Sequence, residues 1–373
     1  MANTFLSRSN SSGTSTQKGT ISVWIKGSEE PSGNNQTTLA CWGNANNHGA
    51  LIWNGGDKID AFDYQSGYAS QLQTTAVLRD SSAWYHIVYA WDTTLSTAND
   101  RQKIYINGIE QTYSTRTNYS TNAATSWNAN SYSMRVGGLN SSSYFNGLMS
   151  HIHFIDGIAY APTLFGETDS TTGQWKIKTS PSVTYGNNGF FILKNGNSVT
   201  DQSGKGNNFT VGGGTLTKTE DNPSNVFCTW NTNYRGTRKD MTLTNGATFI
   251  FEQNSGDSSV SGTIAVSGSG KYYWEQRIAQ VNGTNAAVAG AMHSTEDWST
   301  TPDEVSGNNN TFGVRSNGNA YKNGTNLGSV TAATYNNDIL GIGFDVDNAL
   351  SLIHISEPTR LLSISYAVFC LKK

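Results

Sequence analysis

Cysteine, proline and charged residues are all scarce in this 373-residue sequence, which has three cysteines, six prolines and 14% charged residues. Cys41, Cys228 and Cys370 lie far apart, so they form neither a CxxC metal motif nor a disulfide framework. The formal net charge is only −3 and no cluster of lysine and arginine is found. This balance argues against nucleic acid as a partner.

Long apolar runs are missing as well. No run is long enough to span a bilayer, and the first ten residues lack the apolar centre of a signal peptide. We therefore expect neither a membrane segment nor a secretory leader. What the sequence does have is 39 glycines and 11% aromatic residues. Aromatic side chains suit pleated surfaces and glycine suits tight turns, so the composition predicts an all-β protein.

Several segments between residues 1 and 165 have the pattern of strands. In AWYHIVYAWD, residues 83–92, apolar side chains occupy both faces, which is typical of a strand buried between layers. QKIYINGIEQT predicts a hairpin with Asn107-Gly108 at its turn. With ISVWIK before them and MRVGG and GLMSHIHFIDGIAY after them, these motifs resemble the concanavalin A-like laminin-G/pentraxin sandwich. The resemblance implies an antiparallel jelly roll over residues 1–165.

Aromatic residues gather in one part of this first domain, at Trp42, Trp53, Tyr64 and Tyr68. Exposed rings of this kind can stack on sugar rings while neighbouring Asn and Asp side chains bond the hydroxyls. We take these four as candidate ligand-binding residues. The alternative is that their rings belong to the core of the sandwich.

A calcium site is a second candidate. Laminin-G and pentraxin sandwiches often hold Ca²⁺ through carboxylates and carbonyls at loop tips, so the resemblance implies a search for such ligands. Asp57, Asp60 and Asp63 lie close together in GGDKIDAFD and are the candidate ligands. Ordinary solvated loop acids are the alternative, and no other cofactor is expected.

Histidines offer less evidence of a metal. His151 and His153 would point to the same face of a strand, but a catalytic zinc needs a third ligand and supporting partners. We predict that this pair packs against a neighbouring sheet and that His86 is a core residue.

Signatures of catalysis are absent from the sequence. Glycosidases with a jelly-roll fold need two carboxylates close together on one strand face, as in ExDxE, and neither that pattern nor GxSxG or a Walker motif occurs. The adjacent acid pairs, such as Glu29-Glu30, would point to opposite faces of a strand. The sequence therefore predicts a protein that is not an enzyme.

A segment rich in glycine and asparagine follows at residues 166–224. It reads as an extended connector with short strands around Phe190–Leu193. The string FGETD…YGNNGFF…DQSGKGNNFT resembles a connector in structural proteins of marine bacterial viruses. That resemblance alone implies an association with virions.

Residues 225–349 predict a second sandwich. GKYYWE early and NDILGIGFDVDN late resemble the SPRY domain, a β-sandwich that binds partner proteins through its loops. The strand that the family places next is missing, so this SPRY-like domain is expected to be truncated. The whole chain is thus predicted to be two tandem antiparallel β-sandwiches.

The last stretch, residues 350–373, differs abruptly in composition. LSLIHISEPTR and ISYAVFCL resemble the two arms of a transposase-based sequencing adaptor read as protein, separated by three residues as the index would require. We therefore expect this stretch to be an adaptor artefact and exclude it from fold reasoning. In a structure it would form an ill-packed extension or a strand at the gap in the SPRY-like sheet.

The leading functional hypothesis is a non-catalytic structural or adhesion protein of a bacterial virus, located in the virion. Its modules would bind glycan or protein on the virion or host surface, and homo-oligomerisation is left open. The alternatives are a cellular secreted or surface carbohydrate-binding adhesin and a polysaccharide-active enzyme. Fold resemblance alone does not choose between them.

Overall fold

The computed structural model describes residues 3–28, 31, 33–139, 143–194, 196–235, 241–252, 260–266, 268–279, 288–292, 311–315, 317–329, 337–348 and 350–356. The chain divides into two compact units, the first formed by Met1–Val226 with Leu243–Phe249 and the second by Phe227–Thr242 with Ile250–Lys373. Strands dominate both units, and in the described part the only helices are the short 3₁₀ turns η1 (Ala98–Asp100), η2 (Ser126–Asn128) and η3 (Pro162–Leu164). The prediction of an all-β protein is confirmed.

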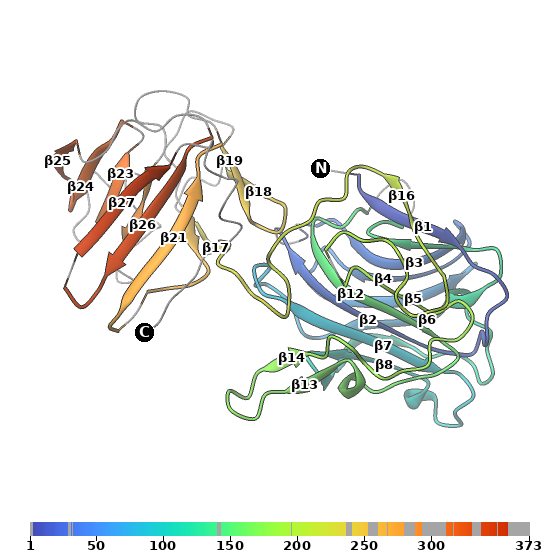
Figure 1. Ribbon diagram of the computed structural model, residues 1–373. Helices are drawn as coiled ribbons and strands as arrows, with labels where there is room; N and C mark the ends of the chain where they lie inside the picture. Colours follow the sequence, from blue (N-terminus) through green and yellow to red (C-terminus); the bar gives the residue numbers. More distant parts are fainter. Residues whose placement is uncertain are drawn as a thin grey trace. The chain divides into compact units, whose positions relative to one another are not determined.

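The first unit has two antiparallel sheets that lie face to face (Figure 1). The eight-stranded sheet has the order β10 (Tyr113–Thr117), β6 (Tyr68–Thr74), β5 (Ile59–Gln65), β4 (Asn47–Trp53), β3 (Gln36–Asn44), β11 (Ser133–Val136), β1 (Phe5–Ser9), β16 (Thr210–Gly213). The six-stranded sheet has the order β15 (Phe190–Ile192), β12 (Gly147–Asp156), β2 (Lys18–Gly27), β7 (Tyr85–Asp92), β8 (Gln102–Ile106), β9 (Ile109–Glu110).

Strand β7 shows how the sequence produces this packing. Ile87, Tyr89 and Trp91 point into the core between the sheets, and each is at most 1% exposed. Val88 points to the outer face of the same strand and is also fully buried. Both faces of β7 are therefore covered, as its continuous apolar run predicts.

The turn between β8 and β9 follows from two residues. Asn107 and Gly108 have φ angles of 49° and 81°. Two successive positive φ angles are the geometry of the tight hairpin turn that Asn-Gly favours, so the predicted hairpin is confirmed. A side chain at Gly108 would also collide with the ring of Trp175, since an added Cβ would lie 2.4 Å from it.

The segment predicted as a connector, 166–224, adds strands to both sheets of the first unit. Strand β15 pairs with β12 in one sheet, and β16 pairs with β1 in the other. Phe165, Tyr185 and Phe191 then pack on Val88 and Ile155 to form a second apolar cluster on the outer face of the six-stranded sheet. The compact unit consequently extends to Val226 and this sheet is covered on both sides.

The hairpin of β13 (Gly166–Thr168) and β14 (Trp175–Ile177) docks on the same outer face through one ring. The rings of Trp175 and Trp24 both pack near His86, with centroids 6.0 Å and 4.8 Å from the imidazole and nearly parallel planes. The Trp175 indole donates to Nδ1 of His86 at 3.0 Å, so Nε2 carries the proton and donates to Oγ of Ser22 at 2.8 Å. His86 is thus neutral, and it is fully buried, as predicted.

A buried ion pair fixes the end of this segment. Nζ of Lys26 on β2 lies 2.7 Å from Oδ2 of Asp221, and the two side chains are 1% and 2% exposed. The indole of Trp84 donates to the same oxygen at 3.2 Å. The end of the segment is therefore held to the six-stranded sheet by opposite charges from which water is excluded.

Three buried histidines predict loss of stability in acid. Burial lowers the pKa of His86 to about 3 and that of His151 to about 4, with the Lys194 charge a second cause at His151, and it lowers the pKa of His153 well below its usual value. An unfolded histidine takes up its proton near pH 6.5, so this stability is complete above that pH and is lost as pH falls toward the folded-state values. We expect a decrease on the order of 2 kcal/mol per histidine by pH 5.

Urea denaturation at pH 7 and pH 5 and constant ionic strength measures this decrease. Asp60 and Asp63 have the opposite effect on stability as pH falls. Burial raises the pKa of both carboxyls, so the folded state binds their protons at a higher pH than the unfolded state does. An unfolding free energy that stays constant or rises between pH 7 and pH 5 would contradict the prediction.

The second unit contains two sheets and a further strand pair. The three-stranded sheet has the order β21 (Lys271–Arg277), β26 (Ile339–Asp345), β27 (Leu350–Ser356), and the four-stranded sheet has the order β22 (Val288–Met292), β23 (Thr311–Arg315), β24 (Asn319–Lys322), β25 (Thr325–Ser329). Strand β17 (Trp230–Arg235) pairs with β20 (Val260–Gly262), and β18 (Met241–Thr244) with β19 (Phe249–Glu252) forms a hairpin whose turn belongs to the first unit.

The two motifs that suggested a second sandwich form neighbouring strands. Trp274 of β21 lies opposite Ile342 of β26 in an antiparallel register, and Ile342 is buried. Strand β27 extends this sheet through backbone pairing with β26, while residues 357–373 lie outside the described residues. Backbone pairing tolerates almost any side chain, so the resemblances to a SPRY domain and to adaptor sequence both stay predictions.

Candidate functional site

A row of aromatic rings crosses the outer face of the eight-stranded sheet. Its members are Trp42 on β3, His48 on β4, Tyr64 on β5 and Tyr68 on β6, which we call the aromatic row. Each is the cross-strand partner of the next. Successive ring centroids are 5.0, 5.6 and 5.4 Å apart. The first three rings are half-buried and Tyr68 is 52% exposed, so a continuous line of ring surface reaches the solvent.

Turn geometry places these rings in line. Strands β3 and β4 meet at a two-residue turn that sets Asn44 opposite Asn47, and a shift of register between Trp42 and Asn44 then puts Trp42 opposite His48. Strands β5 and β6 meet at Ser66, whose φ of 57° suits a tight turn. Since the pleat alternates, each of these residues then faces outward together with its neighbours.

His48 is a neutral member of the row. Its Nδ1 is 3.2 Å from the carbonyl oxygen of Asn44, which requires the proton on Nδ1. Burial lowers the pKa of this imidazole below its usual value, so the ring is uncharged at pH 7. The row as a whole therefore presents uncharged rings.

Phe62 connects the row to a polar hollow. Its ring lies 5.8 Å from both His48 and Tyr68 in edge-to-face geometry. Beside it, a hollow of about 480 Å³ opens on the same face of the sheet. Its lining combines apolar, amide and charged side chains with three glycines, namely Ile52, Phe62, Tyr68, Asn35, Asn54, Gln73, Lys58, Asp60, Gly33, Gly55 and Gly56.

Asp60 is the acid of this hollow. Its side chain is buried at 5% exposure, and Oδ2 accepts hydrogen bonds from the amides of Gln71 at 3.0 Å and Gln73 at 3.5 Å. In the part of the chain that the structure describes, its Oδ1 has no hydrogen-bond partner. Burial raises the pKa of this carboxyl, while the two amides act in the opposite sense.

The three predicted calcium ligands do not come together. Asp63 lies three residues after Asp60 on β5, so its side chain points to the opposite, core side, where its Oδ2 accepts from Tyr119 and from the backbone of Ser126. Asp57 sits in the preceding turn with a φ of 60°. Among the described residues no group of three or more acids, histidines or cysteines could hold a metal ion. The trio does not fit a calcium site.

Trp53 is a second correction. Its side chain is fully buried in the core between the two sheets, and its ring lies edge-on to Tyr85. Strand alternation explains this, because Trp53 is five residues from His48 on β4 and so faces the other side. It cannot stack on a ligand, whereas His48 and Phe62, which no sequence pattern singled out, lie on the outer face.

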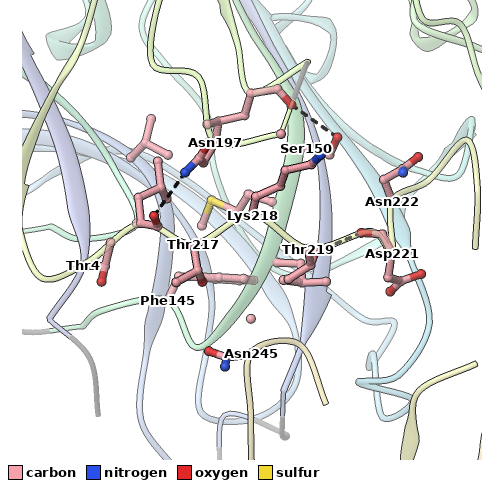
Figure 2. Close-up of a pocket in the computed structure, with 18 of the residues that line it drawn as sticks. Thr4, Phe145, Ser150, Asn197, Thr217, Lys218, Thr219, Asp221, Asn222 and Asn245 are labelled. Atoms are coloured by element: carbon pink, nitrogen blue, oxygen red, sulfur yellow. Dashed lines mark hydrogen bonds between the residues drawn. The ribbon is translucent and has the colours of Figure 1, made fainter. Parts of the chain in front are cut away.

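A second crevice, of about 530 Å³, lies between β1, β12 and the stretch Thr215–Asp221 (Figure 2). Its polar groups bond to one another. The amide of Asn197 donates to the carbonyl of Leu216, and the hydroxyl of Thr219 donates to the carbonyl of Asp221. Because these groups already bond to one another, the crevice is a packing boundary within the fold, and the aromatic row with its hollow is the better candidate site.

Residues 3–163 match the family model described as the concanavalin A-like lectin/glucanases superfamily, in agreement with the resemblance seen in the sequence. A search of curated proteins found no match.

Solved structures similar to the chain include domain 4 of AbnA, a GH43 extracellular arabinanase from Geobacillus stearothermophilus, in complex with arabinotriose. The identity is 20% and the TM-score 0.32, with coverage of 40% of this chain and 65% of that domain. A heptameric SAP-like pentraxin from Limulus polyphemus matches with 12% identity, a TM-score of 0.32 and coverage of 43% and 72%. The sialyllactose-bound CBM40 of Ruminococcus gnavus IT-sialidase has 16% identity, a TM-score of 0.27 and coverage of 37% and 81%.

In the part of the chain that the structure describes, no helix is both long and apolar enough to cross a membrane.

Proposed function

We propose that this protein binds glycans without catalysing a reaction, and that the first unit does so on the outer face of its eight-stranded sheet. The observation that carries the proposal is the aromatic row, which lies beside a hollow lined by amides and one buried carboxylate. Rings that present an apolar face next to fixed polar groups are the usual means of holding a sugar. The match to a lectin and glucanase superfamily is consistent with that chemistry.

Among the described residues, the outer face of the six-stranded sheet is covered by packed side chains. Residues 158–191 contribute Phe165, Tyr185 and Phe191 to a cluster that covers it. A large ligand approaching the sandwich from its faces therefore meets accessible rings on the eight-stranded sheet.

The positions of the acids support a role without catalysis. Hydrolysis of a glycosidic bond needs two carboxylates on either side of that bond. Asp60 and Asp63, the acids of β5, are directed to opposite faces of the sheet, and Asp63 is fully buried. Release of reducing sugar from laminarin or arabinan by the purified protein would overturn this part of the proposal.

Truncating the rings of the row tests binding directly. We expect Trp42→Ala and Tyr68→Ala each to weaken binding to an immobilised polysaccharide by about tenfold, because a buried aromatic contact contributes on the order of 1–2 kcal/mol. Tyr273→Ala in the second unit is the matched control, since Tyr273 is 45% exposed and far from the row in sequence. The measurement is affinity electrophoresis against a panel of neutral and anionic polysaccharides. Equal affinity of all four proteins would contradict the assignment of the row.

The biological setting that we propose is the virion of a bacterial virus, where the glycan or protein partner lies on the virion or the host surface. The connector string and the SPRY-like motifs, GKYYWE and NDILGIGFDVDN, support this proposal by resemblance. A cellular surface adhesin with the same modules is the second candidate. Antibodies raised against the protein should label purified virus particles in the first case and cell envelopes in the second.

A further inference from the structure

The hairpin formed by β13 and β14 is attached to the six-stranded sheet by few contacts. Its two strands pair with each other and, among the described residues, with no strand of either sheet. In the described part of the hairpin, the bond from the Trp175 indole to Nδ1 of His86 is the one hydrogen bond that joins it to the six-stranded sheet. The Trp175 ring also packs against the turn at Gly108. An element with so few contacts can open while the core stays closed.

Buried residues hold the chain on either side of the hairpin. Phe165 comes directly before β13 and Tyr185 follows β14, and both belong to the apolar cluster on Val88 and Ile155. Their rings also lie against His153, with centroids 5.2 Å and 6.1 Å from its imidazole. The hairpin can therefore leave the sheet while this cluster, and with it the cover of His153, stays in place.

The contact between Trp175 and His86 exists in only one protonation state of the imidazole. An indole N–H is a donor and cannot accept, so Nδ1 must present a lone pair to it. Nε2 already uses its proton in the bond to Ser22. A second proton would have to go on Nδ1, where it would face the indole N–H and abolish the bond. Docking of the hairpin thus requires a neutral His86.

The groups that touch His86 do not favour a charged imidazole in the docked state. Its hydrogen-bond partners Ser22 and Trp175 are uncharged, and burial lowers its pKa to about 3. The titratable neighbour on β12 is His153, which would be repelled by a charge on His86. Trp24 lies on β2 and stays beside the imidazole after the hairpin leaves, so its attraction for a cation does not oppose opening.

Charged side chains on the elements around His86 pair with one another. The pairs are Lys26 with Asp221 at β2, Lys103 with Glu110 at β8 and β9, and Lys176 and Lys178 with Glu167 in the hairpin. Lys194 acts on His151 and His153 and lowers the pKa of both. A proton on His86 is consequently stabilised by water, which reaches the ring only when the hairpin opens.

We infer that the β13–β14 hairpin is an acid-sensitive latch: when His86 takes up a proton, Trp175 detaches and the hairpin leaves the outer face of the six-stranded sheet, while the sandwich stays folded. Opening places a cationic imidazole on a face that is closed at neutral pH. It exposes one buried histidine, whereas global unfolding in acid exposes all three. The latch is independent of glycan binding.

Proton linkage determines the size of the effect. His86 has its ordinary pKa of about 6.5 in the open state and a pKa of about 3 in the closed state, so the closed state is favoured fully above pH 6.5 and progressively less below it. Between about pH 6 and pH 4, the ratio of open to closed molecules should rise about tenfold for each unit by which the pH falls.

Fluorine NMR of the full chain labelled with 5-fluorotryptophan measures this ratio. The chain has ten tryptophans, and Trp175→Phe identifies the hairpin signal by its loss. Trp127→Phe identifies a signal of the core in the same way, since Trp127 is fully buried there. We expect the Trp175 signal to move to the position of a solvated indole at a pH where the Trp127 signal is unchanged.

His86→Asn is the decisive variant, because its amide oxygen can accept from the indole and takes up no proton. Its Trp175 signal should stay at the docked position until the core unfolds. Wild-type signals of Trp175 and Trp127 that change together would overturn the latch, and so would a variant that responds to pH as the wild type does. If the variant is undocked already at pH 7, the wild-type slope decides: one proton supports the latch, and a slope of zero overturns it.

Discussion

Lys26→Met is expected to destabilise the first unit by about 3–5 kcal/mol, because it removes the ammonium that lies 2.7 Å from the buried carboxylate of Asp221. Both partners are at most 2% exposed, so water cannot take over the role of the ammonium. Urea denaturation followed by tryptophan fluorescence measures the effect, since most tryptophans lie in the first unit. A shift of the first-unit transition to much lower urea is the expected result.

Two further variants make this prediction specific. Lys18→Met removes the surface pair with Asp92, where Lys18 is 38% exposed, and should change the stability by less than about 1 kcal/mol. The double variant Lys26→Met/Asp221→Leu removes both buried charges and should recover much of the lost stability. If Lys26→Met is no more harmful than Lys18→Met, the pair is not excluded from water.

Asp156→Ala should be comparably harmful, with a loss on the order of 4 kcal/mol. The Asp156 carboxylate is 2% exposed and accepts hydrogen bonds from the backbone amides of Thr14, Ser15 and Asn188 and from the side chain of Asn128. Removing it leaves several buried donors without an acceptor, and each such donor costs about 1–3 kcal/mol. The same urea titration measures the loss.

The control for this variant is Asp169→Ala. Asp169 also accepts from two backbone amides, those of Thr171 and Thr172, but it lies in the exposed turn between β13 and β14. Water can replace its oxygens, so the transition should stay close to that of the wild type. A similarly small shift for Asp156→Ala would mean that the loop at residues 10–17 does not depend on this carboxylate.

Much of the first unit follows from local sequence patterns. The apolar run of β7 and the Asn107-Gly108 turn determine a buried strand and a hairpin without tertiary information. The covering of the six-stranded sheet by residues 158–191 does not follow in the same way. The apolar residues of this segment are spaced among glycines and asparagines, so they show no strand or helix pattern. Their packing site is known only from the structure, where they contact Val88 and Ile155.

The alternation of side chains along a strand makes part of the candidate site predictable from the sequence, namely which residues share a face of the sheet. Residues 60 and 63 differ by three and residues 48 and 53 by five, so alternation alone separates Asp60 from Asp63 and Trp53 from His48. The alignment of Trp42, His48, Tyr64 and Tyr68 needs the register of three strand pairs, which depends on turn geometry. The free oxygen of Asp60 depends on side-chain positions across two strands, and no sequence pattern specifies it.

The covering of the six-stranded sheet also determines how this protein can be divided. A fragment ending at residue 165 would retain every strand from β1 to β12 but would lose Tyr185 and Phe191 from the outer cluster and Asp221 from Lys26. Its exposed apolar patch would favour aggregation over folding. A fragment that ends at Val226, where the first stretch of the first unit ends, would keep these partners. The glycine-rich segment is thus an integral part of the folded unit, although its composition is typical of a flexible linker.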